Sequence, residues 1–263
     1  MPAAEKGGQV QSLLRALSLL RALAESADGM SLSDVAQIAG LAPSTAHRLL
    51  TTLQQERFVR FEPQAGVWQV GVQAFITGSA FLRTRDIVQI ARPYQRRLME
   101  ESGETVNLYV EDEGEVVCMS QVECRQLMRA IARPGGRARM HCSGAGKAIL
   151  AFLDEDEVTR ILRRHGLPRV TERTLDTPTR LREDLARVRA RGFAVDDEEN
   201  ALGLRCVAAP VMGETGAPLA GLSLSGPTAR VTDDRLAALG AMVARTARDI
   251  SRELGGELAV AGT

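Results

Sequence analysis

LAPSTAHRLLTTLQQERFVR, residues 41–60, is the stretch that decides how the first part of this chain folds. Apolar side chains recur in it with the spacing of an amphipathic helix, at Ala46, Leu49, Leu50 and Leu53. Pro43 and Ser44 suit the first turn of that helix, because a proline there gives up no helical hydrogen bond. The opposite face carries hydroxyl, amide and basic side chains and no acid before Glu56. Such a face is either simply solvated or built to contact a polyanion.

The segments around this helix complete a small domain. An apolar stripe with helical spacing precedes it, at Val10, Leu13, Leu14, Leu17, Leu20, Leu23 and Ala24. A shorter helix follows that stripe, capped by Ser31 or Ser33 and ended by Gly40. After the quoted helix, the β-like runs FVRF and VWQV flank the turn sequence EPQAG and predict a hairpin. Helices followed by such a hairpin predict a winged helix-turn-helix over residues 9–71.

A polar face like that of the third helix is, taken alone, more often simply solvated, but the ordered set Ala36, Gly40, Ala46 and Leu49 is what a helix-turn-helix crossing requires and favours contact with DNA. The major groove is walled by phosphates, which would repel an acid on the docking face. Hydroxyl groups can bond phosphates or base edges, and an arginine can grip a guanine edge with two hydrogen bonds. The formal net charge is +0, so this prediction depends on where the charges lie. The predicted DNA contacts are Ser44, Thr45, His47, Arg48, Thr51 and Thr52 on the helix, and Arg57 and Arg60 at the start of the wing.

The rest of the chain predicts a second domain of the α+β class. From Thr105 the apolar period changes to two, and TVNLYV, EVVCMSQV, LMRAIA, RCVAAPVM and LAGLSLSG predict strands. Helical patterns occupy residues 143–153, 155–165 and 178–191, and a closing helix runs from about Thr232 to Leu254. Strands and helices mix without strict βαβ alternation, which favours an antiparallel sheet flanked by helices.

Several short patterns in this second domain invite a chemical interpretation. HCSGAGKAIL, residues 141–150, is similar to a phosphate loop but lacks its first glycine and its final hydroxyl. It still predicts a helix start whose free backbone N–H groups could hold a carboxylate, with a plain, closely packed helix start as the alternative. The acid run in VDDEEN is interpreted as a solvated loop. Ser223 and Ser225, like Leu204 and Cys206, lie two apart on a strand, which fits a small polar pocket or merely a sheet face.

Other features bound the possible functions. The histidines lie far apart with no ligand spacing, so we expect no metal site, and no cofactor is predicted. Cys142 and Cys206 leave an enzyme acting on a small acid as an alternative. The chain has no apolar run of about 18 residues and no secretory pattern, and its four cysteines form no disulfide framework. These observations predict a cytoplasmic protein with no membrane span.

Four segments resemble the IclR family of bacterial transcription regulators: VQSLLRALSLLRALAE, LSDVAQIAGLAPSTAHRLLTTLQQERFVR, MHCSGAGKAILA and FAVDDEENALGLRCVAAPV. The similarity covers residues 9 to about 255 and is greatest to the branch of acetate-operon (glyoxylate-bypass) repressors. It implies a regulator without enzymatic activity, assembled as a homodimer or homotetramer. The implied organisation is a disordered tail (1–8), the winged helix-turn-helix (9–71), a dimerising linker helix (72–84), a GAF-like effector domain (85–256) and a second tail (257–263).

The resemblance also implies partners and site residues. It favours a repressor over an activator of a carboxylic-acid operon, binding a pseudo-palindromic DNA operator and responding to a small carboxylic acid. A sensor that acts through protein partners is a further alternative. The implied effector pocket comprises Gly144, Ala145, Asp196, Leu204, Cys206, Ser223 and Ser225. Ala130 and Ala138 also line it and replace bulkier apolar side chains of the glyoxylate-sensing branch, so we expect room for a 2-oxo or aromatic acid larger than two carbons.

Overall fold

The computed structural model describes residues 10–84, 87–130 and 132–256. The chain divides into two compact units, Met1–Arg85 and Asp86–Thr263. The tails predicted at residues 1–8 and 257–263 lie outside the described residues. None of the described helices combines the length and the apolar character needed to cross a lipid bilayer.

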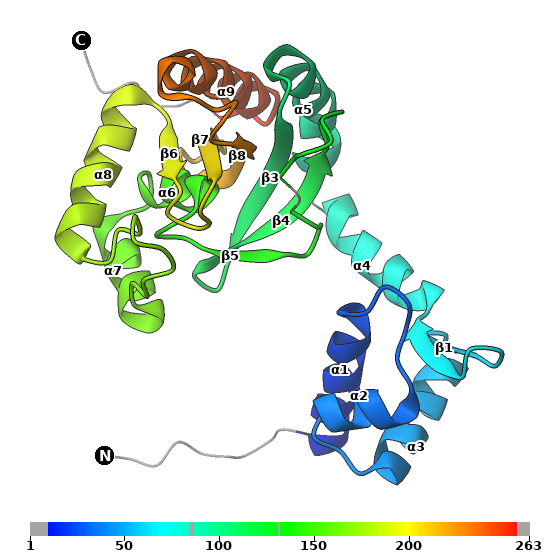
Figure 1. Cartoon of the computed structure of the whole chain (residues 1–263). Coiled ribbons are helices and arrows are strands. Elements are labelled where there is room, and N and C mark those ends of the chain that lie inside the picture. The colour runs from blue at the N-terminus through cyan, green and yellow to red at the C-terminus, as the bar shows by residue number, and fades with distance from the viewer. Residues whose placement is uncertain (1–9, 85–86, 131, 257–263) are drawn as a thin grey trace, which may run out of the picture. The chain divides into compact units, whose positions relative to one another are not determined.

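The first unit is a winged helix-turn-helix (Figure 1). Its helices are α1 (Gln11–Ala24), α2 (Leu32–Ile38), α3 (Pro43–Gln55) and α4 (Val72–Thr84), and its antiparallel hairpin is formed by β1 (Val59–Glu62) and β2 (Val67–Val70). Met30 exchanges two backbone hydrogen bonds with Trp68, of 3.0 and 2.8 Å. The segment before α2 therefore ties the wing to the helices, and the predicted fold of this part is confirmed.

Local sequence signals explain how α2 and α3 meet. The Ser31 hydroxyl caps α2 by accepting a hydrogen bond from the Asp34 backbone N–H at 3.3 Å. Gly40 follows α2 with a φ of +65°, a conformation that glycine adopts without steric cost. Pro43 then begins α3. Beneath these helices lies a core of Leu19, Ala22, Leu23, Val35, Ala36, Ala46, Leu50, Val59 and Trp68.

The apolar stripe of α1 is longer than the core of its own unit requires. Leu19, Ala22 and Leu23 are buried. The first half of the stripe is 38–61% exposed, at Val10, Leu13, Leu14 and Leu17. Exposed apolar side chains also stand on α4, at Val72, Phe75 and Ile76. Both helices therefore present apolar surface that the first unit does not itself cover.

The second unit is built on one antiparallel sheet with the strand order β5-β4-β3-β8-β7-β6. The strands are β3 (Thr105–Asp112), β4 (Glu115–Val122), β5 (Arg137–Arg139), β6 (Ala194–Asp197), β7 (Leu204–Met212) and β8 (Pro218–Pro227). The helices are α5 (Ile87–Ser102), α6 (Gly144–Leu150), α7 (Glu155–His165), α8 (Pro178–Arg191) and α9 (Asp233–Glu253). This arrangement confirms the predicted α+β class with helices on an antiparallel sheet.

The two faces of this sheet have different covers (Figure 1). On β3, Val106, Leu108 and Val110 enter the core formed with α5 and α9. Because successive strand residues point to opposite faces, Asn107 and Tyr109 point to the other side. That side packs against α6, α7 and α8 in a second apolar cluster, which includes Val116, Ile149, Val158, Leu181 and Leu185.

The prediction of a strand over LMRAIA is wrong. The described residues between Val122 and Arg137 form no strand, and Leu127 and Met128 are exposed. The strand next to β4 is instead β5, after a turn in which the Gly135 N–H donates to the Cys118 carbonyl at 2.7 Å. The apolar residues of this segment do not indicate a strand, because its alanines, Ala130 and Ala132, line a cavity in a loop.

Candidate functional site

The predicted DNA-contact residues lie on the outer side of α3 and just after it. Ser44, His47, Arg48, Thr52, Arg57 and Arg60 are exposed, and Thr45 and Thr51 are half-buried. Ala46 and Leu50 on the opposite side are buried in the core. The Thr51 and Thr52 hydroxyls donate to backbone carbonyls one turn earlier, at 2.8 and 3.1 Å. The helix therefore presents a solvent-facing polar surface that its own core holds in place.

The two flanks of α3 have different neighbours. On one flank, the His47 ring meets the Trp68 ring of the wing edge-on, with centroids 6.3 Å apart. On the other flank, α1 and α3 enclose a groove of about 270 Å³, lined by Ser12, Arg15, Thr45, Arg48, Leu49 and Thr52. No acid stands among the described residues that line it. Ser12 and Arg15 were missed because the pattern of α1 predicts only an apolar stripe.

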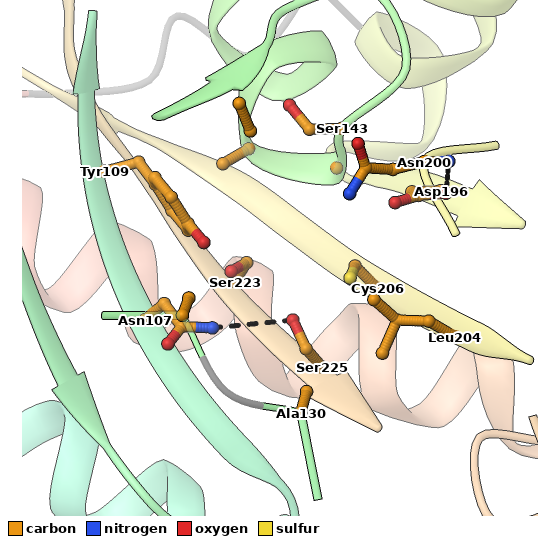
Figure 2. A pocket seen from close by; sticks show the side chains of 14 residues that line it. Asn107, Tyr109, Ala130, Ser143, Asp196, Asn200, Leu204, Cys206, Ser223 and Ser225 are labelled. Atoms are coloured by element: carbon orange, nitrogen blue, oxygen red, sulfur yellow. Dashed lines mark hydrogen bonds between the residues drawn. The ribbon is translucent and has the colours of Figure 1, made fainter. Parts of the chain in front are cut away.

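The second unit contains a cavity of about 140 Å³ on the polar side of the sheet (Figure 2). The nine residues implied by resemblance all line it: Ala130, Ala138, Gly144, Ala145, Asp196, Leu204, Cys206, Ser223 and Ser225. Five further lining residues were not predicted from the sequence: Asn107, Tyr109, Ala132, Ser143 and Asn200. The structure thus brings together residues from distant segments around one cavity.

Strand register explains why these polar side chains meet. Asp196 pairs with Cys206, and Cys206 pairs with Ser225 on the next strand. Asn107 pairs with Ser223 in the neighbouring row, and its amide nitrogen is 3.5 Å from the Ser225 hydroxyl. Directly paired residues have Cβ atoms about 5 Å apart on one face. The cavity floor is therefore a continuous polar patch across four adjacent strands.

Glycines allow α6 to lie directly on this floor. A Cβ added to Gly144 would lie 3.2 Å from the Cys206 Cβ, and one added to Gly221 would lie 2.9 Å from the Ala145 carbonyl oxygen. The Ser143 hydroxyl caps α6 by accepting from the Gly146 N–H at 3.2 Å. The first N–H groups of a helix have no carbonyl partner within it. The start of α6 therefore adds backbone donors beside the polar floor.

Asp196 is the one carboxylate among the described residues that line the cavity. It is 1% exposed, and its Oδ1 accepts hydrogen bonds from the backbone N–H groups of Glu199 at 2.8 Å and Asn200 at 3.3 Å. Burial raises its pKa to about 6, although Lys147 and these hydrogen bonds act in the opposite direction. A second negative charge placed beside it would raise that pKa further.

A buried cation holds the segment behind Asp196. The Lys147 ammonium on α6 is buried and donates to the Glu199 carboxylate at 2.5 Å, the Val195 carbonyl at 2.6 Å and the Asp184 carboxylate at 2.8 Å. Burial raises the pKa of Glu199 to about 7. Burial also acts to raise the pKa of Asp184, but Lys147 and Arg187 outweigh it, so that pKa is lowered.

The interpretation of VDDEEN as a solvated loop is wrong for two of its acids. Asp196 and Glu199 are buried, whereas Asp197 and Glu198 are half-buried. Asp197 pairs with Arg205 at 2.5 Å and with Arg173 at 2.7 Å. The buried Lys147 explains the difference, because a cation inside a protein requires carboxylate partners. Sequence alone gives no sign of this pairing, which joins residues far apart in the chain.

The cysteines of this region do not have the environment of nucleophiles. Burial, with Asp196 next in effect, raises the pKa of both thiols, that of Cys142 to about 12. Reactive cysteines need a lowered pKa, because the thiolate is the nucleophile. The enzyme alternative built on Cys142 or Cys206 therefore gains no support. Within the described ranges, no cluster of His, Cys, Asp and Glu has the arrangement of a metal site.

Comparison with known proteins places both units. Residues 12–63 match the family described as IclR helix-turn-helix domain, and residues 79–252 match Bacterial transcriptional regulator IclR C-terminal. The acetate operon repressor of Salmonella typhimurium is 52% identical over 251 residues, 95% of this chain and 92% of the relative. Transcriptional repressor IclR of Escherichia coli strain K12 is 51% identical with the same coverage. The crystal structure of the Thermotoga maritima IclR has a TM-score of 0.80 at 30% identity, covering 94% of this chain and all of that one.

Proposed function

This chain belongs to the IclR family of bacterial transcription regulators, and from that premise we propose that it is a repressor whose hold on its operator changes with a small carboxylic acid. The two relatives described above are repressors of transcription and not enzymes. The observation that carries the proposal is the exposed, acid-free face of α3 within a winged helix-turn-helix. An activator would use the same parts, so the direction of control is decided by experiment.

The DNA-contact surface that we propose extends over three elements. The outer side of α3 enters the major groove, where Ser44, Arg48 and Thr51 reach base edges and His47, Thr45 and Thr52 support the flanks. Arg57 and Arg60 contact phosphates from the start of the wing. Across the groove beside α3, Ser12 and Arg15 of α1 add phosphate contacts. Phosphate contacts fix orientation and base contacts specify sequence, so these groups have separable effects.

Two copies of the first unit are needed for a pseudo-palindromic operator. The exposed apolar side chains of α1 and α4 support pairing through those helices, with a second copy of the chain as the occupant. A homodimer is the minimal assembly, and a homotetramer pairs two such dimers. Replacing Leu13 with Glu would place a charge in that interface, so light scattering should then report a smaller assembly than for the wild type.

The proposed effector site is the cavity in the second unit. Its donors are the hydroxyls of Ser223 and Ser225, the Asn107 amide and the first backbone N–H groups of α6. A carboxylate would take these donors and keep away from Asp196, because like charges repel at short range. Ala130 and Ala138 form the apolar side, with room for more than a two-carbon acid. These features support a glyoxylate-like or pyruvate-like acid, or a somewhat larger one.

Control follows from differential binding. An acid that binds one arrangement of the second units more tightly must shift the population towards that arrangement. The linker helix α4 belongs to the first unit and precedes the second, so it is the covalent route between the two sites. The coupling is a free energy shared by both ligands and acts in both directions.

Fluorescence anisotropy with DNA from the region upstream of the protein's own gene tests this function. We expect specific binding, measured against scrambled DNA of equal length, and a change of at least about fivefold when pyruvate or glyoxylate is present. Binding to both DNAs with equal affinity would contradict the operator role. Specific binding that no acid changes would contradict only the effector role.

A further inference from the structure

Tyr109 lines the cavity, yet neither the sequence patterns nor the resemblance assigned it a role. It lies on β3, paired with Gly221 of β8 and with Cys118 of β4. The register with β4 shifts between Leu108 and Tyr109, so β4 carries one extra residue at this point. Such a bulge changes the local direction of side chains and is common beside binding sites.

The surroundings of Tyr109 leave its ring a defined place. Gly221 opposite it has no side chain, and the Ala145 carbonyl oxygen comes within 2.9 Å of where a Cβ would be. The ring therefore forms a wall of the cavity next to the first turn of α6. Figure 2 shows it extending from β3 towards Ser223, over the polar floor. The volume of the Tyr109 ring fills part of the space that the small side chains of Ala130 and Ala138 leave in the cavity.

The phenol hydroxyl of Tyr109 is available for a ligand. Among the described residues it has no hydrogen-bond partner in the structure. Burial raises the pKa of this phenol, and nearby Cys118, Cys206 and Asp196 act in the same direction. The group therefore stays neutral at physiological pH and can donate a hydrogen bond. The other lining residues with hydroxyl groups are Ser143, Ser223 and Ser225, and the Ser143 hydroxyl already donates to the Arg139 carbonyl at 2.8 Å.

The size of the cavity limits the ligand. A cavity of about 150 Å³ elsewhere holds benzene, a molecule of six non-hydrogen atoms. The cavity of about 140 Å³ found here is of similar size. One wall is the aromatic ring of Tyr109 and another consists of Ala130, Ala132 and Ala138. A 2-oxo acid of three or four carbons has about six or seven non-hydrogen atoms, close to the number in benzene, whereas a phenyl-bearing acid is about twice as large.

We propose that Tyr109 is a specificity-determining residue that donates a hydrogen bond to the second oxygen of a 2-oxo or 2-hydroxy acid of three or four carbons. This inference rests on the proposed effector function. The carboxylate takes the donors near α6, and the second oxygen, on the adjacent carbon, takes the Tyr109 hydroxyl. Tyr109 is half-buried. An acid without that oxygen would lose the hydrogen bond from this hydroxyl, which weakens its binding.

Calorimetric titration of the full chain with pyruvate, propionate and phenylpyruvate tests the proposal. Pyruvate and propionate have the same number of carbons, but propionate lacks the second oxygen. We expect the wild type to bind pyruvate at least about tenfold more tightly than propionate. Tyr109→Phe keeps the ring and removes the donor, so the preference should fall to within about threefold, mainly through weaker pyruvate binding. Tyr109→Ala opens the wall, so phenylpyruvate should bind more tightly to it than to the wild type.

Tyr94→Phe is the matched control, since these are the two tyrosines of the chain. The Tyr94 hydroxyl donates to the Glu253 carboxylate at 3.0 Å, and Tyr94 does not line the cavity. This variant should keep the wild-type preference. Thermal unfolding shows whether each variant is folded. If Tyr109→Ala does not fold, Tyr109→Phe, which adds no volume, still tests the role of the hydroxyl.

The outcomes separate the two levels of the proposal. If the wild type binds pyruvate with a preference that Tyr109→Phe retains, the role of Tyr109 is wrong and the effector function stands. If the wild type binds propionate as tightly as pyruvate, the role of the second oxygen is wrong. If none of the three acids binds, the effector class of small acids fails, and the role of Tyr109 fails with it.

Discussion

The polar face of α3 and the polar cavity of the second unit use similar side chains in opposite surroundings. Most of the α3 residues are exposed, and a small apolar core beneath them holds the helix. The cavity residues are buried or half-buried, and the segment of Asp196 is held by a buried network around Lys147. A surface that contacts a polyanion needs only a stable helix beneath it, whereas the polar groups of a buried site need hydrogen-bond partners within the protein. Substitutions should therefore separate the two regions by their effect on stability.

The largest expected effect is on the buried network. Lys147→Met leaves Glu199 without its cation and Asp184 with only the exposed Arg187, and such a loss costs about 3–5 kcal/mol of unfolding free energy. Urea unfolding followed by circular dichroism measures it, while emission of the sole tryptophan, Trp68, follows the first unit separately. The Trp68 transition should not move. A change below about 1 kcal/mol would show that the network is not structurally important.

Arg160→Met is the matched control for that variant. Arg160 pairs with Glu157 at 3.0 Å on the surface of α7, with 60% of its side chain exposed. Exposed pairs of this kind contribute little, so the change should be within about 0.5 kcal/mol. A loss as large as that of Lys147→Met would mean that the second unit is sensitive to any lost cation.

Asp196→Asn should change how the unfolding free energy of the second unit depends on pH. The pKa of Asp196 is about 6 in the folded chain against an ordinary value of 3.8. A raised carboxyl pKa favours folding at low pH, and this contribution is lost as pH rises from about 4 through 6. At about 1.4 kcal/mol for each pH unit, the wild type loses up to about 3 kcal/mol relative to the variant. Urea unfolding at pH 4.5 and pH 8 should show about 2 kcal/mol of this loss, because the rest occurs below pH 4.5; an equal difference at both values would contradict it.

Arg48→Ala should weaken operator binding by about tenfold to a hundredfold, the cost of losing a bidentate base contact. Arg48 is exposed, so unfolding free energy should change by less than about 0.5 kcal/mol. Anisotropy measures the DNA affinity, and calorimetry should find acid binding unchanged. Loss of both activities, or of neither, would count against separate sites.

Arg15→Gln should have the smallest effect, of about twofold to fivefold on operator affinity. A lost phosphate contact weakens specific and scrambled DNA alike and reduces the salt slope by about one. Arg21→Gln is the matched control, because Arg21 lies on the same helix but does not line the groove beside α3. If the salt dependence of DNA affinity is equal in both variants and the wild type, α1 does not contact DNA.

The same contrast explains what the sequence could predict. Around α3 the signals are local: Ser31 as a cap, Gly40 in the turn and Pro43 in the first turn all determine structure within a few residues. Period-two spacing also predicted that Ser223 and Ser225 share a face. It could not say that this face lines a cavity, because that depends on which strands pair.

The missed and wrong assignments come from long-range structure. Asn107 and Tyr109 were recognised as strand residues, but their place in the cavity follows from pairing with β8, more than 100 positions away. The burial of Glu199 follows from Lys147, 52 positions earlier. The apolar pattern of LMRAIA is typical of a strand, yet the strand that pairs with this edge of β4 is β5. Nine of the cavity residues came from resemblance to a family, and Ala132, Ser143 and Asn200 were missed as Asn107 and Tyr109 were.

The central claim is that the α3 surface and the cavity act on each other. Calorimetric titration of pyruvate into the free protein and into the protein saturated with operator DNA tests it most directly. The account predicts that DNA changes the Kd of the acid by at least about fivefold, and by the same factor as the acid changes the Kd of the DNA. An acid that binds both forms with equal Kd would contradict it.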